Sequence, residues 1–343
     1  MNNTLTALKG IKVGHSTRLD KLTGCTFISF DKELPVAYKS YGGAPGTYAT
    51  ENLNNGMSFA SRDGLFIAGG SLNGLTCAAG IVERLVEKKQ GYKIGNSLMP
   101  AISGAIVWDL GVEIAQFQSS YGKEAVDNLS DKPVENGNVG AGTGTAVGKF
   151  QYLELGKSNP AMKAGVGSAR IDLGNGIIVC ALSVVNALGN VINPDGTVLA
   201  GNRNEKEGFT TFEEVTEFVT TKKSNTTISV VGINVDLKSR ENYERIAHFG
   251  TQGQVRAISP VQTSVDGDTV FVFSTEEIKE PLNSFGKYWE TPAWPEFTVD
   301  IIGQAVAKAV QESIYDACQK AETIEFEKAY KGVIPSTKDY KKI

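Results

Sequence analysis

Glycine is the residue that most limits how this chain can fold. There are 38 glycines among 343 residues, about 11% where about 7% is usual. Many of them gather in two clusters, at 40–57 and 139–150. Glycine weakens helix and strand interiors but suits tight turns, so the clusters predict loops. Apolar stretches rich in Val and Ile, such as 176–192, favour buried strands broken by turns.

Helical and strand signals alternate along the chain, which indicates an α/β or α+β class. We expect helices at 71–89, 240–258 and 298–321. Strands are expected at 64–70, 104–110 and 226–237. The segment 261–275 predicts a hairpin with Asp266 and Gly267 at its turn, because Asp-Gly is a preferred hairpin pair. Residues 201–224 are polar and charged and predict an exposed connector.

Composition excludes several function classes. Lys and Arg number 34 against 38 for Asp and Glu, which gives a net charge of −4. No basic surplus is available to neutralise nucleic-acid phosphates. The N-terminus has no apolar signal core, and no segment predicts a membrane helix. The four cysteines are widely separated, which favours free thiols in a reducing compartment. We therefore expect a cytoplasmic protein that binds neither nucleic acid nor membranes.

Familiar catalytic motifs do not fit this sequence. It contains only two histidines, His15 and His248, too few for a His-based zinc site or a Ser-His-Asp triad. The loop 140–145 approaches a dinucleotide fingerprint, but Thr145 stands at the third glycine position. We therefore expect neither a metal nor a cofactor.

One chemistry that needs no histidine is available where the polar connector meets the strand. If the bond between Asn225 and Thr226 were cut, Thr226 would carry a free α-amine beside its own hydroxyl. An α-amine titrates near pH ~7.7–8.0 and can serve as a base, so nucleophile and base would share one residue. The alternative is that Asn-Thr-Thr before a strand is an ordinary polar junction.

The order of motifs resembles the L-aminopeptidase/D-esterase family of self-cleaving hydrolases and, within it, the nylon-oligomer (6-aminohexanoate-oligomer) hydrolases. The likeness rests on GIKVGHST, GCTFI, YGGAPGT, IAGGSLNGL, VGAGTGTAVGK, VVNALGNVINPDG, SNTTISVVGINVDL and AISPVQTSVDGDTVF, which span residues 10–275. The resemblance implies a four-layer α-β-β-α sandwich of the N-terminal-nucleophile hydrolase type. It also implies that a single domain cleaves itself into residues 1–225 and 226–343, with Thr226 as nucleophile.

The resemblance also implies a set of catalytic partners. Asp268 would contact the Thr226 hydroxyl or amine, and Asp266 would support Asp268. Two close carboxylates raise one pKa, which suits a proton acceptor. Lys149 would lie beside Thr226 and stabilise negative charge, and Asn186 would donate to an oxyanion. The alternatives are a plain Asp-Gly turn, a solvated lysine and an asparagine that closes a strand.

Further residues would line the substrate cleft by the same resemblance. Trp108 aligns with an aromatic wall position, although a core tryptophan is equally consistent. Tyr41, Gly42 and Gly43 would line the same cleft. Gln262 departs from the family, because relatives tend to have histidine there.

The favoured interpretation is an N-terminal-threonine amidohydrolase that acts on short peptides or linear aminoalkanoate oligomers. Its two fragments are expected to stay together as a heterodimer and to assemble further, as a tetramer by resemblance. One alternative is an acyltransferase similar to the ornithine acetyltransferases, which self-cleave before a threonine. The other is an uncleaved binding protein without enzymatic activity.

Overall fold

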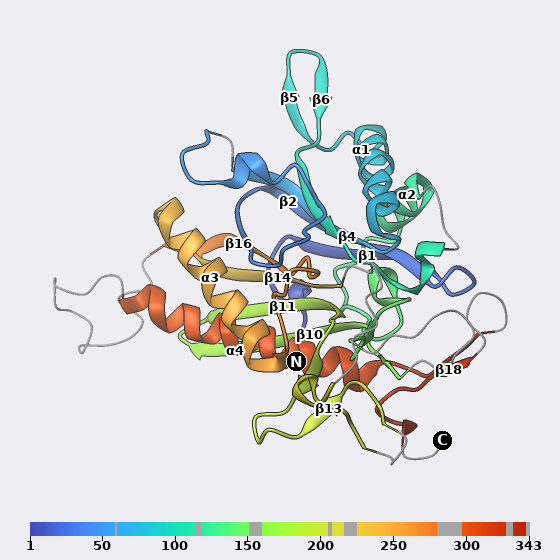
Figure 1. Ribbon diagram of the computed structural model, residues 1–343. Helices are drawn as coiled ribbons and strands as arrows, with labels where there is room; N and C mark the ends of the chain where they lie inside the picture. Colours follow the sequence, from blue (N-terminus) through green and yellow to red (C-terminus); the bar gives the residue numbers. More distant parts are fainter. Residues whose placement is uncertain are drawn as a thin grey trace.

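The structure is a computed structural model (Figure 1). It describes residues 1–58, 60–113, 118–150, 160–204, 208–215, 225–279, 297–326 and 332–340. In this part of the chain the α-helices are α1 (Cys77–Glu87), α2 (Ser119–Asp127), α3 (Arg240–Ala257) and α4 (Phe297–Lys320). The strands of the main sheets are β1 (Ile11–Arg18), β2 (Thr23–Ser40), β3 (Thr47–Tyr48), β4 (Ser61–Ala68), β7 (Ile102–Ile106), β10 (Val166–Gly174), β11 (Ile177–Asn186), β14 (Thr226–Val235) and β16 (Thr269–Ile278).

The remaining elements are short strands and 3-10 helices. The minor strands are β5 (Tyr92–Ile94), β6 (Ser97–Met99), β8 (Ala146–Val147), β9 (Met162–Lys163), β12 (Asn190–Ile192), β13 (Val198–Ala200), β15 (Ile258–Ser259), β17 (Ile324–Phe326) and β18 (Gly332–Ile334). Short 3-10 helices occur at Leu5–Ala7, Glu51–Leu53, Ser71–Thr76, Leu110–Glu113, Gly140–Gly142 and Phe212–Glu214. The β5–β6 hairpin projects from the body at the top of Figure 1.

Strand β2 joins two sheets into one hydrogen-bonded path. Among the described residues the path runs β10-β11-β14-β16-β2-β4-β7-β3, and β1 also pairs with β2. Thr23–Phe30 of β2 pairs with β1, and pairing with β4 continues as far as Pro35, whereas Val36–Ser40 pairs antiparallel with β16. Strands β14 and β16 are parallel to each other. The 18 residues of β2 therefore serve both sheets.

Among the described residues the buried apolar side chains form three large clusters and one small one, and the three large clusters show the order of the layers. Cys25 and Phe27 of β2 pack with α1 and α2, whereas Ile28 and Phe30 face the second sheet. This alternation is the two-residue period of a strand. On β14, Val230 faces the space between the sheets and Val231 faces α3 and α4. The molecule is thus the expected α-β-β-α sandwich (Figure 1).

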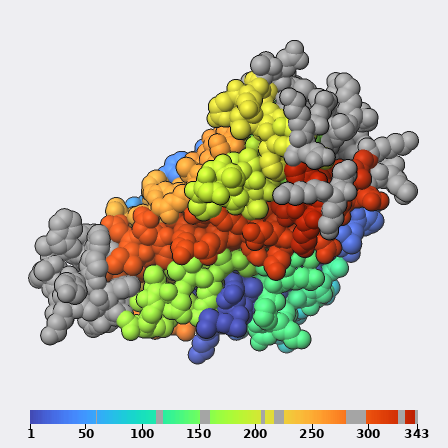
Figure 2. Space-filling model, turned by 90° about the horizontal axis from the view of Figure 1, so that it is seen from below, coloured from blue at the N-terminus to red at the C-terminus, as the bar shows by residue number. Residues whose placement is uncertain are grey.

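The outer layers differ in exposure. Figure 2 shows α4 as a long orange-red band across one face of the molecule. Its inner side is buried through Ile302, Val306, Val310 and Ile314, the positions that helical spacing predicts. No helix among the described residues has the length and apolarity required to cross a bilayer.

Most predicted elements are confirmed. Strand β14 begins at Thr226 as expected, and Ser239 caps α3 by accepting a hydrogen bond from the Asn242 N–H at 3.3 Å. The predicted hairpin at 261–275 is wrong. Residues before Thr269 form a loop, and β16 pairs with β14 and β2 instead of folding back on itself. The described parts of the connector, 201–204 and 208–215, are only partly exposed, because Asn202 is buried and its side chain donates to the Gly148 carbonyl. The rest of the predicted connector, 205–207 and 216–224, lies outside the described residues.

Candidate active site

The junction between Asn225 and Thr226 is buried at the start of β14, which lies between β11 and β16. Thr226 is 2% exposed and pairs with Asn186 across β11 and β14. The Thr226 hydroxyl donates to the carbonyl oxygen of Asn225 at 2.5 Å. The same oxygen accepts the Gly267 N–H at 2.7 Å. The threonine oxygen therefore lies directly against the peptide group that precedes it, and a backbone donor polarises that carbonyl.

Asp268 lies one residue before β16 and next to this peptide. Its carboxylate accepts the N–H groups of Thr227 at 2.6 Å and Gln262 at 2.9 Å. The side chain is 2% exposed. Burial, and after it the charge of Asp266, raise the pKa of Asp268 to about 7. A carboxyl with such a pKa can accept a proton near neutral pH.

Asp266 shapes the loop that carries Asp268. One of its oxygens accepts the N–H and the hydroxyl of Thr263, at 2.9 and 2.7 Å. The other oxygen, Oδ1, is buried and has no hydrogen-bond partner among the described residues. Burial raises the pKa of Asp266 as well. The backbone of Asp266 bridges to Asn225 in parallel fashion, so this loop is attached to the junction itself.

Asn186 and Lys149 approach from the other side of Thr226. The Asn186 amide donates to the Trp108 carbonyl at 2.7 Å and accepts the Ala146 N–H at 3.2 Å. The Lys149 ammonium donates to the backbone carbonyl of Asn186 at 2.8 Å. Its positive charge lowers the pKa of both Asp266 and Asp268 against the effect of burial. The structure therefore brings together all five predicted catalytic residues.

The predicted cleft residues have a more structural role than expected. A Cβ at Gly42 would lie 2.2 Å from the Asp266 carbonyl oxygen, so only glycine fits there. The Gly43 N–H donates to the Thr263 carbonyl at 2.9 Å. Both glycines thus support the Asp266 loop. Tyr41 is 47% exposed, and its hydroxyl lies 3.1 Å from Nδ1 of His248.

Trp108 contributes its backbone to the site. It is half-buried, and its carbonyl accepts the Asn186 amide. The next residue, Asp109, is buried and accepts the N–H groups of Gly70 and Gly111 at 3.0 and 3.1 Å. Burial raises the pKa of Asp109 to about 7. These contacts fix the loop that presents the Trp108 carbonyl.

One predicted contact differs in the intact chain. Asp268 was expected to contact the Thr226 hydroxyl or amine, but its carboxylate instead accepts the N–H of Thr227, the residue that follows Thr226. The Thr226 hydroxyl is directed to the Asn225 carbonyl, and its nitrogen is still part of the peptide bond. Sequence reasoning also missed Gly267, whose N–H is a backbone donor and leaves no side-chain signal. A Cβ at Gly267 would lie 2.9 Å from the Thr226 hydroxyl oxygen.

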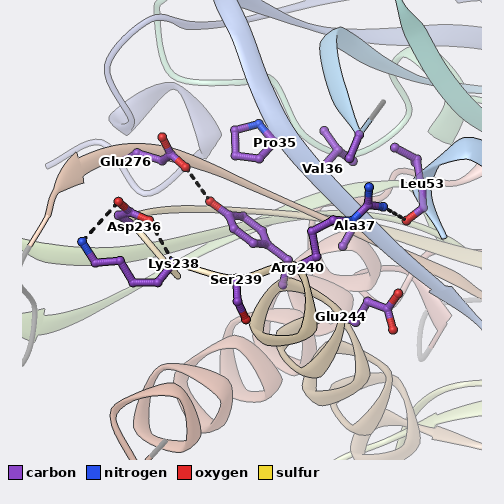
Figure 3. A pocket seen from close by; sticks show the side chains of 12 residues that line it. Pro35, Val36, Ala37, Leu53, Asp236, Lys238, Ser239, Arg240, Glu244 and Glu276 are labelled. Carbon is purple, nitrogen blue, oxygen red and sulfur yellow. Dashed lines mark hydrogen bonds and ion pairs between the residues drawn. The ribbon is translucent and has the colours of Figure 1, made fainter. Parts of the chain in front are cut away.

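A separate hollow lies at the opposite end of β14. It has a volume of about 140 Å³ and is bordered by Asp236 and Arg240 (Figure 3). Tyr243 donates to Glu276 at 3.0 Å across it. Ten residues of strand, roughly 30 Å at ~3.3 Å each, separate this hollow from Thr226, so it has no part in the chemistry at the junction. Within the described residues no group of three or more His, Cys, Asp or Glu side chains could hold a metal ion.

Comparison with known proteins places this geometry in a family. The sequence model of peptidase family S58 matches residues 3–331. The chain belongs to peptidase family S58. It is 29% identical to an uncharacterized aminopeptidase of Mycobacterium leprae, over 97% of this chain and 94% of that protein. It is 26% identical to a 6-aminohexanoate-oligomer endohydrolase of Paenarthrobacter ureafaciens, over 91% of this chain and 84% of that protein.

Solved structures share the fold. The L-aminopeptidase D-Ala-esterase/amidase of Ochrobactrum anthropi, described as a variant of the Ntn hydrolase fold, aligns with a TM-score of 0.70 at 17% identity. The alignment covers 98% of this chain and 91% of that one. A Burkholderia β-aminopeptidase aligns with a TM-score of 0.69 at 16% identity, over 99% and 92%. The S58 chain is therefore a hydrolase that acts on amide bonds, built on an Ntn-hydrolase sandwich.

Proposed function

We propose that this S58 hydrolase activates itself by cutting the bond between Asn225 and Thr226, and then uses Thr226 as its nucleophile. The observation that carries the proposal is the contact of the Thr226 hydroxyl with the Asn225 carbonyl, which is also held by the Gly267 N–H. A nucleophile and a polarised carbonyl are the two parts that acyl transfer requires. Both are buried away from water at this junction.

Self-cleavage follows as an N-to-O acyl shift. The Thr226 oxygen attacks the Asn225 carbonyl carbon, and its proton passes to a base, for which the buried Asp268 carboxylate is suited. The Gly267 N–H stabilises the oxyanion. The carbon–nitrogen bond then breaks, the Thr226 nitrogen takes up a proton, and an ester remains. Water hydrolyses this ester and leaves the Asn225 carboxylate and a free Thr226 amine.

Turnover repeats the chemistry on an amide substrate. The free Thr226 amine, with Asp268, takes the hydroxyl proton and returns it to the leaving amine. The Asn186 amide nitrogen carries two N–H groups, one of which is engaged with Trp108, and the other is suited to the substrate oxyanion. Lys149 adds positive charge on the same side. Water then releases the acid from the acyl-threonine.

The substrates we propose are short peptides or linear aminoalkanoate oligomers. The support comes from the S58 relatives, whose names include aminopeptidases and a 6-aminohexanoate-oligomer endohydrolase. Release of the free acid without an added acceptor amine separates hydrolysis from acyl transfer.

We expect the fragments 1–225 and 226–343 to remain one particle. Strands β14 and β16, which would belong to the small fragment, lie between β11 and β2 of the large one. A tetramer of this heterodimer stays an expectation, to be measured by light scattering. The four cysteines are free and buried, which supports a reducing compartment such as the cytoplasm.

Intact mass tests self-cleavage directly. The purified chain should give two fragments, and sequencing should find Thr226 at the start of the smaller one. Thr226→Ala should stay a single chain of 343 residues, because no hydroxyl remains to attack. Thr227→Ala is the matched control and should still be cut. A fragment that begins at Thr227, or a cut in Thr226→Ala, would refute the assignment.

A further inference from the structure

A buried glutamine on α3 reaches the two strands that carry the nucleophile and the acid. The Gln254 side chain is fully buried. Its amide nitrogen donates to the Thr227 carbonyl at 2.9 Å and to the Thr269 carbonyl at 3.4 Å. Thr227 follows Thr226 at the start of β14, and Thr269 follows Asp268 at the start of β16. One amide group therefore spans the entrances of both strands.

The close approach of α3 to the sheet makes this span possible. A Cβ at Gly250, one turn before Gln254, would lie 2.6 Å from Val270 of β16. A Cβ at Gly253 would lie 2.4 Å from the Ala307 carbonyl of α4. Two glycines thus let α3 lie against both the sheet and α4, which brings the glutamine amide within reach of backbone oxygens.

The contacts of Gln254 complete a frame around the nucleophile. Asp268 accepts the Thr227 N–H at 2.6 Å, which fixes the peptide after Thr226. Gln254 fixes the following peptide through its carbonyl. Its second bond, to Thr269, adjoins Asp268. A displacement of the backbone at Thr226 and Thr227 relative to Asp268 therefore strains or breaks the hydrogen bonds at Thr227 and Gln254.

We propose that Gln254 is a positioning residue that holds Thr226 and Asp268 in register for catalysis. The inference rests on the proposed function, because it assigns Gln254 a part in the chemistry of Thr226. It touches neither the substrate nor the reacting atoms. Its effect is geometric: a misplacement of about 1 Å in an active site can lower the rate about 100-fold.

Three variants test this role. Gln254→Met keeps length and volume but donates no hydrogen bond. Gln254→Glu introduces a carboxyl that can donate its O–H to a backbone carbonyl only while it is protonated. Gln252→Glu, on the same helix, is the matched control. All are compared with the wild type by cell-free translation with intact-mass time courses, and by kcat and KM on an aminoacyl p-nitroanilide and a linear 6-aminohexanoate oligomer.

Gln254→Met should slow self-cleavage and lower kcat about 10-fold to 100-fold, with KM within about twofold of wild type. The ratio of the Gln254→Glu rate to the wild-type rate should be highest at low pH and fall as pH rises. The buried carboxyl has a raised pKa, and its ionised form repels the carbonyl oxygens of Thr227 and Thr269. Asp266, Asp268 and Lys149 are present in both proteins, so the ratio removes the pH dependence that the two proteins share and leaves the effect of the introduced carboxyl, including its influence on the pKa of Asp268. Gln252→Glu should show a flat ratio.

Wild-type kcat in Gln254→Met, or a pH-independent deficit in Gln254→Glu, would overturn the positioning role. If Gln254→Met does not fold, the pH ratio of Gln254→Glu decides alone. Failure of the proposed function looks different: the wild type itself would then remain uncut at Asn225–Thr226.

Discussion

Adding one methyl group at Gly42 should disable self-cleavage without touching any reacting group. An ideal Cβ there would lie 2.2 Å from the Asp266 carbonyl oxygen and 2.7 Å from the Asp268 nitrogen. Ordinary contact begins at 3.4 Å, so the carbonyl oxygen must recede by about 1.2 Å. Both contacts are backbone atoms, which no side-chain rotation can relieve.

The displaced segment is the one that carries the Asp268 carboxylate and the Gly267 N–H. A shift of about 1 Å can lower an enzymatic rate about 100-fold, and we expect Gly42→Ala to slow self-cleavage by about that factor. The assay is a time course of intact mass after cell-free translation. Gly208→Ala is the control, because the atoms nearest to a Cβ there belong to the Asn204 side chain, at 3.2 Å and beyond.

Folding must be checked in the same samples by thermal unfolding. If Gly42→Ala folds and is cut at the wild-type rate, then the Asp266–Asp268 loop does not position the reacting groups, and the proposed geometry is wrong. An equal slowing in Gly208→Ala would also refute the reasoning, because the nearest described atoms to a Cβ at that site belong to Asn204 and not to the loop.

Three further outcomes are expected from the site. The rate of self-cleavage should rise with pH through about 7 and then level off, because burial and the charge of Asp266 raise the pKa of Asp268 to about 7 and only the ionised carboxylate accepts a proton. Asp266→Asn should move the midpoint of this pH profile to lower pH, and a midpoint at higher pH would contradict the prediction. Asn186→Ala should fold but lose ~10²–10³ in kcat, as for a lost oxyanion donor, which steady-state kinetics and thermal unfolding can separate. Asp109→Asn should stabilise the fold most above pH 7, by up to about 4 kcal/mol at 1.36 kcal/mol per unit of pKa. Burial raises the Asp109 pKa from 3.8 to about 7, so wild-type stability is lost as pH rises between those values. An equal gain at pH 3 in urea unfolding would argue against this.

The sequence predicts which side chains form the site better than it predicts the backbone contacts that hold them in place. Thr226 stands out because a polar segment meets a Val-rich strand there, and family motifs add Asp268 and Asn186. The Gly267 N–H has no such signal, because every residue except proline offers one. The predicted hairpin at Asp266 and Gly267 failed because local turn preference was overridden by the parallel pairing of β16 with β14.

Gln254 was also missed, although a signal was present. Ile246, Ala247, Gly250 and Ala257 are buried on α3, at spacings that place them on the same face as Gln254. A long polar side chain on an apolar helix face requires a buried partner. What the sequence could not say is that the partners are two backbone carbonyls on different strands.

The interleaving of β14 and β16 between β11 and β2 has a consequence for how long the enzyme lasts. Before the cut, a denatured chain regains this strand order by closing loops within one molecule, at an entropic cost that grows slowly with length. If the chain is cut as proposed, two separate chains must afterwards meet and insert two central strands between two others, which depends on concentration and leaves hydrophobic edges exposed while it proceeds. The mature enzyme would therefore owe its lifetime to the rate of unfolding rather than to an equilibrium, and the uncut Thr226→Ala chain should refold from urea where the cut protein aggregates.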